Sequence, residues 1–435
     1  MEQTIQQTHV VRNRTPSQNI GLKFFKMIHK LLALIVIAWL MNGMFTFVMP
    51  YFPNFLRYGT FALWLAVALV TKPKFAENYF KRMLPLLLFF TYILIVSFFT
   101  DYEYISLYPK NILYLIIIYS IFLYYVDNRY RKFQKKILTF IIFDLLFIGI
   151  NTYLKLIENP QISRYLSAGT EAREMYLGAT SVLGIGNYGF FYGLVSIILL
   201  LGFLIFYTRK LKILYVLLLF ASIALMIKAS FTIAILFAFI FLFMIILMKY
   251  VNKNIVLLVA PAFLILMVLA RNGIAQLFNK IGALEFVSFD VSVRFYELAS
   301  FFSNHSIDGT DLLSRLDRYK MSIYAFLNNF ISGTTIGYNQ GYLPGGHSTW
   351  FDLLALFGVF SIPFFLFLIQ AYKHSVNLAP VKFHFFVKLY WMYFLCLGFI
   401  NTVLFANIFI IWLLFLPFLI NYFFGKKEMD LEEKS

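Results

Sequence analysis

Charged residues are scarce in this sequence. Only 13% of its 435 residues are charged, whereas 61% are hydrophobic. A soluble domain cannot hide so much apolar surface, so the composition excludes an ordinary soluble protein and indicates a polytopic membrane protein. Helices satisfy their own backbone polar groups inside lipid, and the expected fold is therefore an all-α bundle.

Groups that bind metals or cofactors are also few. Cys396 is the single cysteine, which excludes an internal disulfide. Six histidines are scattered along the chain, and the sequence has no HExxH, CxxC or EF-hand pattern. No Gly-rich phosphate loop follows a strand-like segment. We therefore expect no metal and no cofactor, and neither hydride nor nucleotide chemistry.

The positive charge of the chain lies mainly in short segments between apolar runs. The formal net charge is +17, and clusters such as 72–82, 127–136 and 208–212 carry much of it. Lys and Arg concentrate on the cytoplasmic side of membrane proteins, so these segments and both termini are predicted to be cytoplasmic. Anionic membrane lipid, and not nucleic acid, is the expected partner of these charges.

About twelve apolar runs are long enough to cross the hydrocarbon core of a bilayer, which needs about 20 residues each. In the run from 212 to 248 the only break is Lys228. The predicted spans lie near 31–50, 57–71, 83–100, 111–126, 136–157, 186–207, 212–228, 230–248, 254–270, 349–371, 384–401 and 405–424. The predicted divisions are a cytoplasmic segment 1–30, nine spans in 31–270 with an outer loop at 158–185, a large extracytoplasmic loop 271–348, three spans in 349–424 and a cytoplasmic tail 425–435.

The large loop contains apolar residues at helical spacing. The segments "EFVSFDVSVRFYELASFF" and "DLLSRLDRYKMSIYAFLNNF" both show this pattern. It predicts two or three amphipathic helices that lie over the outer mouth of the bundle. Long loops in compact proteins are commonly functional.

Three arginines and one histidine in this loop could act on a phosphorylated substrate. Arg294, Arg315 and Arg318 lie on the predicted helices, and an arginine fork matches phosphate oxygens in two places. His347 can take a proton from a hydroxyl. Ser348 after it is a good N-cap for the helix beginning near 349. The alternative is that the arginines are solvated helix charges and that His347 is an interfacial anchor.

Two acidic residues lie inside or at the edge of predicted spans. Asp144 falls within the run 136–157, and Asp352 follows His347 by five residues. Charges at such positions are costly and often functional. For Asp352, a structural role at the interface is the alternative to a catalytic one.

The segment "RYKMSIYAFLNNFISGTTIGYNQGYLPGGHSTWFDLLALFG" and the residues just before it resemble the signature region of the O-antigen polymerase and O-antigen ligase family. The overall plan of many spans and one large late loop is also similar. Leu356 stands where the family commonly has an acidic residue. The residues that carry the resemblance are Arg315, Tyr319, Gly333 with Gly337, His347 with Ser348, Phe351 and Gly358.

The resemblance implies a metal-independent glycosyltransferase of the bacterial cytoplasmic membrane. Such an enzyme joins repeat units carried on undecaprenyl diphosphate into capsular, exo- or O-antigen polysaccharide. His347 and Arg315 are then the catalytic residues, with Arg294, Arg318 and Tyr319 binding substrate. The family's earlier basic residue corresponds to Lys228, Arg164 or Arg173, and its mid-chain asparagine to Asn187.

The implied partners are the lipid-linked glycans, a chain-length regulator and other polysaccharide assembly proteins. Two other functions fit the same sequence. One is a ligase that transfers lipid-linked glycan to a different acceptor, and the other is a flippase or transporter for lipid-linked oligosaccharides. A flippase is expected to concentrate its polar residues inside the bundle, whereas here they gather in one outer loop.

Overall fold

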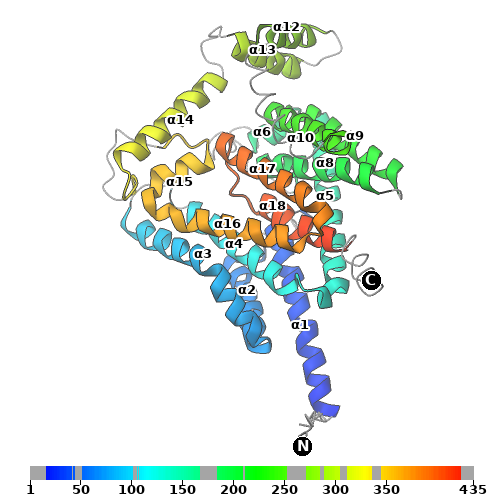
Figure 1. Cartoon of the computed structure of the whole chain (residues 1–435), viewed down its shortest axis with the longest axis vertical. Coiled ribbons are helices and arrows are strands. Elements are labelled where there is room, and N and C mark those ends of the chain that lie inside the picture. Colours follow the sequence, from blue (N-terminus) through cyan, green and yellow to red (C-terminus); the bar gives the residue numbers. More distant parts are fainter. Residues whose placement is uncertain are drawn as a thin grey trace, which may run out of the picture.

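A computed structural model shows a helical protein (Figure 1). Its described part contains no β-strand. Seven helices within it are long and apolar enough to cross a membrane. The chain is therefore an all-α protein of the membrane-embedded type. The structure describes residues 16–41, 43–44, 51–100, 105, 107–166, 184–208, 211–251, 271–284, 289–303, 311–335 and 344–422.

The helices follow the predicted apolar runs closely. Each predicted span overlaps a helix except 254–270, which lies outside the described residues. The helices are α1 (Pro16–Met41), α2 (Asn54–Thr71), α3 (Pro73–Phe99), α4 (Leu107–Tyr125), α5 (Arg131–Glu158), α6 (Ile162–Tyr165), α8 (Tyr188–Tyr207), α9 (Lys212–Lys228), α10 (Thr232–Tyr250), α12 (Arg271–Gly282), α13 (Phe289–Ser303), α14 (Asp311–Asn328), α15 (Thr349–Phe357), α16 (Ile362–Leu378), α17 (His384–Ile400) and α18 (Ala406–Phe409). Short 3-10 turns span Asn128–Tyr130, Gly358–Ser361 and Val381–Phe383, and a π-helical segment, Ile410–Phe415, continues α18.

The first helix is longer than its apolar run. α1 begins at Pro16, well before the predicted start of the span at residue 31. Proline is favoured at the first helical position, and no second proline interrupts the chain before Pro50. The helix therefore extends through the polar, basic residues that precede its apolar part.

The long apolar stretch 212–248 forms two helices. α9 ends at Lys228, and Ser230 takes the left-handed backbone conformation, with φ of 57°. A residue in this conformation stops a helix, because it turns the chain out of the helical path. α10 then begins at Thr232.

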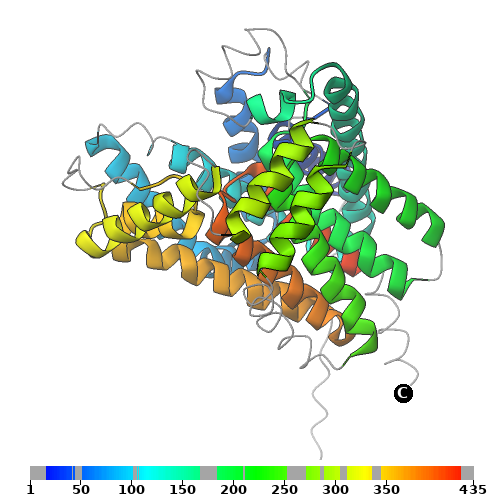
Figure 2. The same cartoon turned by 90° about the horizontal axis from the view of Figure 1, so that it is seen from above.

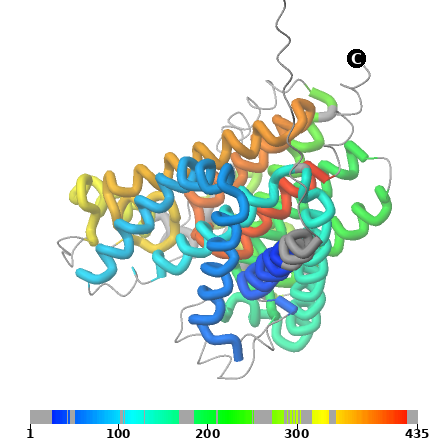
Figure 3. Tube along the Cα trace, turned by 90° about the horizontal axis from the view of Figure 1, so that it is seen from below, coloured from blue at the N-terminus to red at the C-terminus, as the bar shows by residue number. Residues whose placement is uncertain are grey.

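The most buried helices are α8 and the helix that starts at Ala406. Nearly every side chain of α8 from Gly189 to Leu204 is buried. Gly193 faces Ile411, and a Cβ at this position would meet that side chain, so the glycine allows the two helices to approach closely. Other helices surround this pair (Figure 1), and a view from below shows α1 almost along its axis, beside α2 and α5 (Figure 3).

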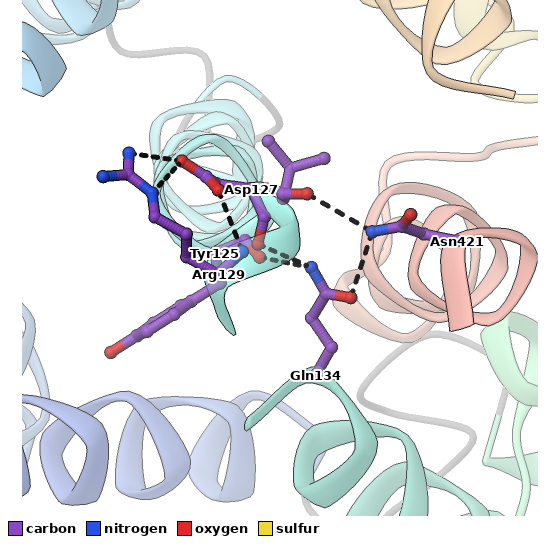
Figure 4. Close-up of polar contacts among 6 residues, drawn as sticks. Tyr125, Asp127, Arg129, Gln134 and Asn421 are labelled. Atoms are coloured by element: carbon purple, nitrogen blue, oxygen red, sulfur yellow. Dashed lines mark hydrogen bonds and ion pairs between the residues drawn. The ribbon is translucent and has the colours of Figure 1, made fainter. Parts of the chain in front are cut away.

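Polar contacts connect three helix ends on the side predicted to be cytoplasmic (Figure 4). Gln134 donates to the Tyr125 carbonyl at 2.6 Å, and Asn421 donates to Gln134 Oε1 at 3.2 Å. Arg129 pairs with Asp127 at 2.6 Å, and its hydrogen bonds lower the pKa of the Asp127 carboxyl. The end of α4, the start of α5 and the end of the last helix are thus linked.

In the described part of segment 271–348 there are three helices, and the sequence predicts two or three. α12 and α13 pack against each other beyond one end of the bundle and lie across its middle when seen from above (Figures 1 and 2). α14 packs against α15. This packing brings together the residues of the candidate site.

Candidate functional site

The site is built around the turn from Gly345 to Ser348, directly before α15. Ser348 is the N-cap of α15, and its hydroxyl accepts a hydrogen bond from Phe351 N at 3.3 Å. This confirms the predicted cap. The same hydroxyl donates to the Gly398 carbonyl on α17 at 3.2 Å, so the turn is tied to a second helix.

The Asp352 carboxylate fixes the turn through hydrogen bonds. Its side chain is 2% exposed and accepts hydrogen bonds from Ser322 Oγ at 2.6 Å, Gly346 N at 3.3 Å and Ser348 N at 3.2 Å. Ser322 on α14 accepts in turn from Gly345 N at 2.8 Å. Because His347 lies between two amides bonded to one carboxylate, its backbone has little freedom.

His347 contacts Arg318 of α14. The distance from Arg318 Nη1 to His347 Nε2 is 2.5 Å. A guanidinium can only donate and does not lose its proton, so Nε2 is the acceptor in this pair. A hydrogen bond in this contact requires the imidazole tautomer that carries its proton on Nδ1. A cation and a potential base lie in direct contact.

Two glycines of the family-like pattern meet where α14 and α15 end. Gly333 and Gly358 have φ values of 68° and 54°. A Cβ on Gly358 would overlap the carbonyls of Phe330 and Ile331, and one on Gly333 would overlap the backbone of Leu356. Glycine is required at both positions, because the two backbones are in contact and the conformations are left-handed.

A buried polar network supports the site from α8 and α17. Asn401 donates to Tyr192 Oη at 2.6 Å and accepts from the Tyr188 hydroxyl. Its carbonyl accepts from Thr349 Oγ1 at 3.2 Å, and Tyr319 of α14 donates to the Ile400 carbonyl at 2.7 Å. These bonds fix the start of α15 against the end of α17.

The arginine predictions have different outcomes. Arg318 is the predicted substrate-binding residue that the structure brings to His347. Arg315 lies on α14 three residues earlier and Arg294 lies on α13, but the side chains of both fall outside the described part. Arg173 and Gly337 are also outside the described residues.

The other predicted residues lie apart from the histidine or have structural contacts. Asn187 is the N-cap of α8 and accepts from Phe190 N at 3.4 Å. Lys228 is exposed at the end of α9, and Arg164 is half-buried on α6. Among the described side chains, none of these three bonds to Arg318 or His347. Tyr319 joins α14 to the end of α17 through its hydrogen bond to the Ile400 carbonyl.

Sequence reasoning did not place Ser322 or Asn401 at the site. Asp352 was recognised only as an acid at the edge of a span. The sequence feature that marks Asp352 is its position in the first turn of an apolar helix, directly after a glycine-rich turn. Asn401 ends a predicted span, and nothing in the local sequence distinguishes it from an ordinary helix terminus.

No model of a known protein family matches the chain. No curated protein sequence matches it either.

Proposed function

We propose that the chain is a glycosyltransferase that polymerises lipid-diphosphate-linked oligosaccharide repeat units on the outer leaflet of the cytoplasmic membrane. The observation that carries the proposal is the contact between Arg318 and His347 on a rigid turn at the start of an apolar helix. The start of a membrane-spanning helix lies at the membrane surface, where the diphosphate of a lipid-linked donor also lies. The resemblance to the O-antigen polymerase and ligase family supports the same reaction.

The reaction needs a positive group and a proton acceptor. A hydroxyl of the acceptor attacks the anomeric carbon of the donor, and the bond from that carbon to the diphosphate oxygen breaks. The lipid diphosphate leaves with the electron pair, and positively charged donors stabilise its growing charge. The proton of the attacking hydroxyl passes to His347.

The contact between the two residues suggests how substrate prepares the base. While Arg318 donates to His347 Nε2, the lone pair of that nitrogen is occupied and cannot take the proton of the acceptor hydroxyl. A diphosphate competes for the guanidinium fork, because two charge-assisted bonds are stronger than one bond to a neutral imidazole. Donor binding then frees Nε2 for the acceptor hydroxyl. Arg315, one turn before Arg318 and Tyr319 on α14, is the proposed second arginine of this clamp.

We also propose twelve spans, with both termini cytoplasmic and segment 271–348 outside. Contacts between helix ends support this orientation. Lys72 lies over the Tyr124 and Tyr130 rings, and Arg131 bonds to the Tyr422 carbonyl, all at ends predicted to be inside. Ends predicted to be outside meet around Asn401. The proposed partners are undecaprenyl-diphosphate-linked glycans, a chain-length regulator and other assembly proteins.

The test uses substitutions of His347 and Arg315 with measurement of polymer and of lipid-linked single units. His347→Ala is expected to reduce chain growth by roughly 10²- to 10⁴-fold, the usual contribution of a proton-transfer group. Single lipid-linked units should then accumulate. His347→Gln keeps a hydrogen-bonding side chain that cannot take the proton, and it should be equally inactive. Arg315→Lys keeps the charge, loses the fork and should lose most activity.

Lys320→Arg is the matched control, because Lys320 is an exposed cation on the same helix whose ion pair among the described side chains is with Asp317. It should polymerise normally, and all variants should insert at normal levels. Normal polymer from both His347 variants would refute the catalytic assignment. If His347→Gln polymerises and His347→Ala does not, His347 orients the acceptor hydroxyl and is not its base.

A further inference from the structure

The exposed face of α14 changes character along the helix. Its described exposed residues up to Lys320 are charged, namely Asp317, Arg318 and Lys320. Beyond Lys320 the exposed side chains are apolar with a single exception, Asn328, which donates to the Tyr324 carbonyl within the helix at 2.8 Å. The exposed apolar residues are Met321, Ile323, Tyr324, Leu327, Phe330 and Ile331. Leu327 is 63% exposed and Ile331 is 69% exposed, which would be unfavourable in water.

α14 runs parallel to the membrane helix beside it. Ser322 bonds to Asp352 near the start of α15, and Val359 N donates to the Phe330 carbonyl at 3.1 Å beyond its end. α14 and α15 therefore lie side by side and run in the same direction. Gly358 lies ten residues after Ser348, which corresponds to about 15 Å of helix, or half the thickness of a bilayer core.

The turn that follows α14 satisfies its backbone with protein partners. Gly333 N donates to Asn329 O at 2.8 Å, Thr334 N to Ala355 O at 2.9 Å and Thr335 N to Leu356 O at 3.3 Å. Thr334 and Thr335 are buried. Irregular backbone is tolerated inside a membrane only where protein groups satisfy its hydrogen bonds, because lipid supplies none.

The turn after α14 contacts α3, which itself contacts the start of α16. Tyr92 of α3 stacks on Phe360 at 4.5 Å between ring centroids, and its hydroxyl donates to the Ser332 carbonyl at 3.5 Å. Next to this contact, Ile95 lies one turn after Tyr92 on α3 and Ile362 lies two residues after Phe360, and both side chains are exposed. Both belong to helices long and apolar enough to cross a membrane.

We propose that α14 is a re-entrant helix, and that the exposed apolar side chains from Met321 on this helix to Ile331 in the turn after it contact the hydrocarbon chains of membrane lipids. It enters the leaflet on the His347 side, reaches the level of Gly358 and returns without crossing. Lys320 and Asp317 then mark the headgroup region, with the Arg318–His347 pair at the same level. This inference does not depend on the proposed enzymatic function.

The test measures the surroundings of single nitroxide labels on full-length protein in phosphatidylcholine–phosphatidylglycerol vesicles. Cys396→Ser provides the background, since Cys396 is the single native cysteine. Labels are placed through Tyr324→Cys, Leu327→Cys and Ile331→Cys. Asp317→Cys and Lys320→Cys are the matched controls on the charged part of the same helix. Collision with oxygen, which dissolves in lipid, is compared with collision with a water-soluble nickel chelate.

The three apolar positions should favour oxygen, and the preference should increase from 324 to 331 as the helix descends. The two controls should favour the nickel chelate. Preferential collision of labels at 324, 327 and 331 with the nickel chelate would overturn the proposal, because the helix would then lie in water. Inaccessibility to both reagents would overturn it too, and spin–spin broadening in that case would identify a second copy of the chain as the cover.

Discussion

Removal of the Asp352 carboxylate is expected to release the turn that carries His347. In Asp352→Ala, the amides of Gly346 and Ser348 lose the carboxylate that accepts from them, and the Ser322 hydroxyl keeps the Arg318 carbonyl as an acceptor at 3.3 Å. A buried donor left without a partner costs about 1–3 kcal/mol. Water can reach part of the opened turn, so we expect a loss of about 2–4 kcal/mol in local stability and not the full sum.

Hydrogen exchange of the peptide covering 344–351 measures this loss directly. Each 1.4 kcal/mol corresponds to a tenfold change in an opening equilibrium, so exchange of the two amides should accelerate roughly 30-fold to several hundred-fold. Asp352→Asn keeps the shape and one acceptor oxygen, and should accelerate exchange less than Asp352→Ala does.

Asp317→Ala is the control, because Asp317 is an acid on α14 whose side chain is 71% exposed. Its removal should leave exchange in 344–351 unchanged, and neither Asp352 variant should alter exchange in α8. If Asp352→Ala exchanges at the rate of the unaltered protein, the carboxylate does not hold the turn. Its buried position would then need another explanation.

Two further predictions concern packing and topology. Gly358→Ala should destabilise the protein by about 1–3 kcal/mol, because alanine must adopt a left-handed conformation against two carbonyls. Thermal unfolding measures this loss. Gly273→Ala is the neutral control, because a Cβ at that position meets no other atom. In a Cys396→Ser background, a membrane-impermeant thiol reagent added to intact cells should label Lys280→Cys and spare Lys74→Cys. The reverse labelling pattern would contradict the proposed orientation.

The sequence by itself determined the class of the protein and the position of most helices. Crossing a bilayer requires a minimum length of apolar chain, so runs such as 186–207 appear as helices with nearly the same bounds. The cap at Ser348 was also readable, because a hydroxyl before an apolar run satisfies a free helix amide. These features depend on neighbouring residues alone.

The tertiary structure decided which distant residues form the site. The pattern of α14 showed an amphipathic helix, but it did not show which of Arg294, Arg315 and Arg318 lies beside His347, and the resemblance assigned the catalytic role to Arg315. Only the packing of α14 along α15 places Arg318 at His347 and Ser322 at Asp352. Helical periodicity tells which side of a helix is apolar but not whether that side meets protein, lipid or water. The partner of each face is set by packing between segments far apart in the chain, and local sequence carries no record of it.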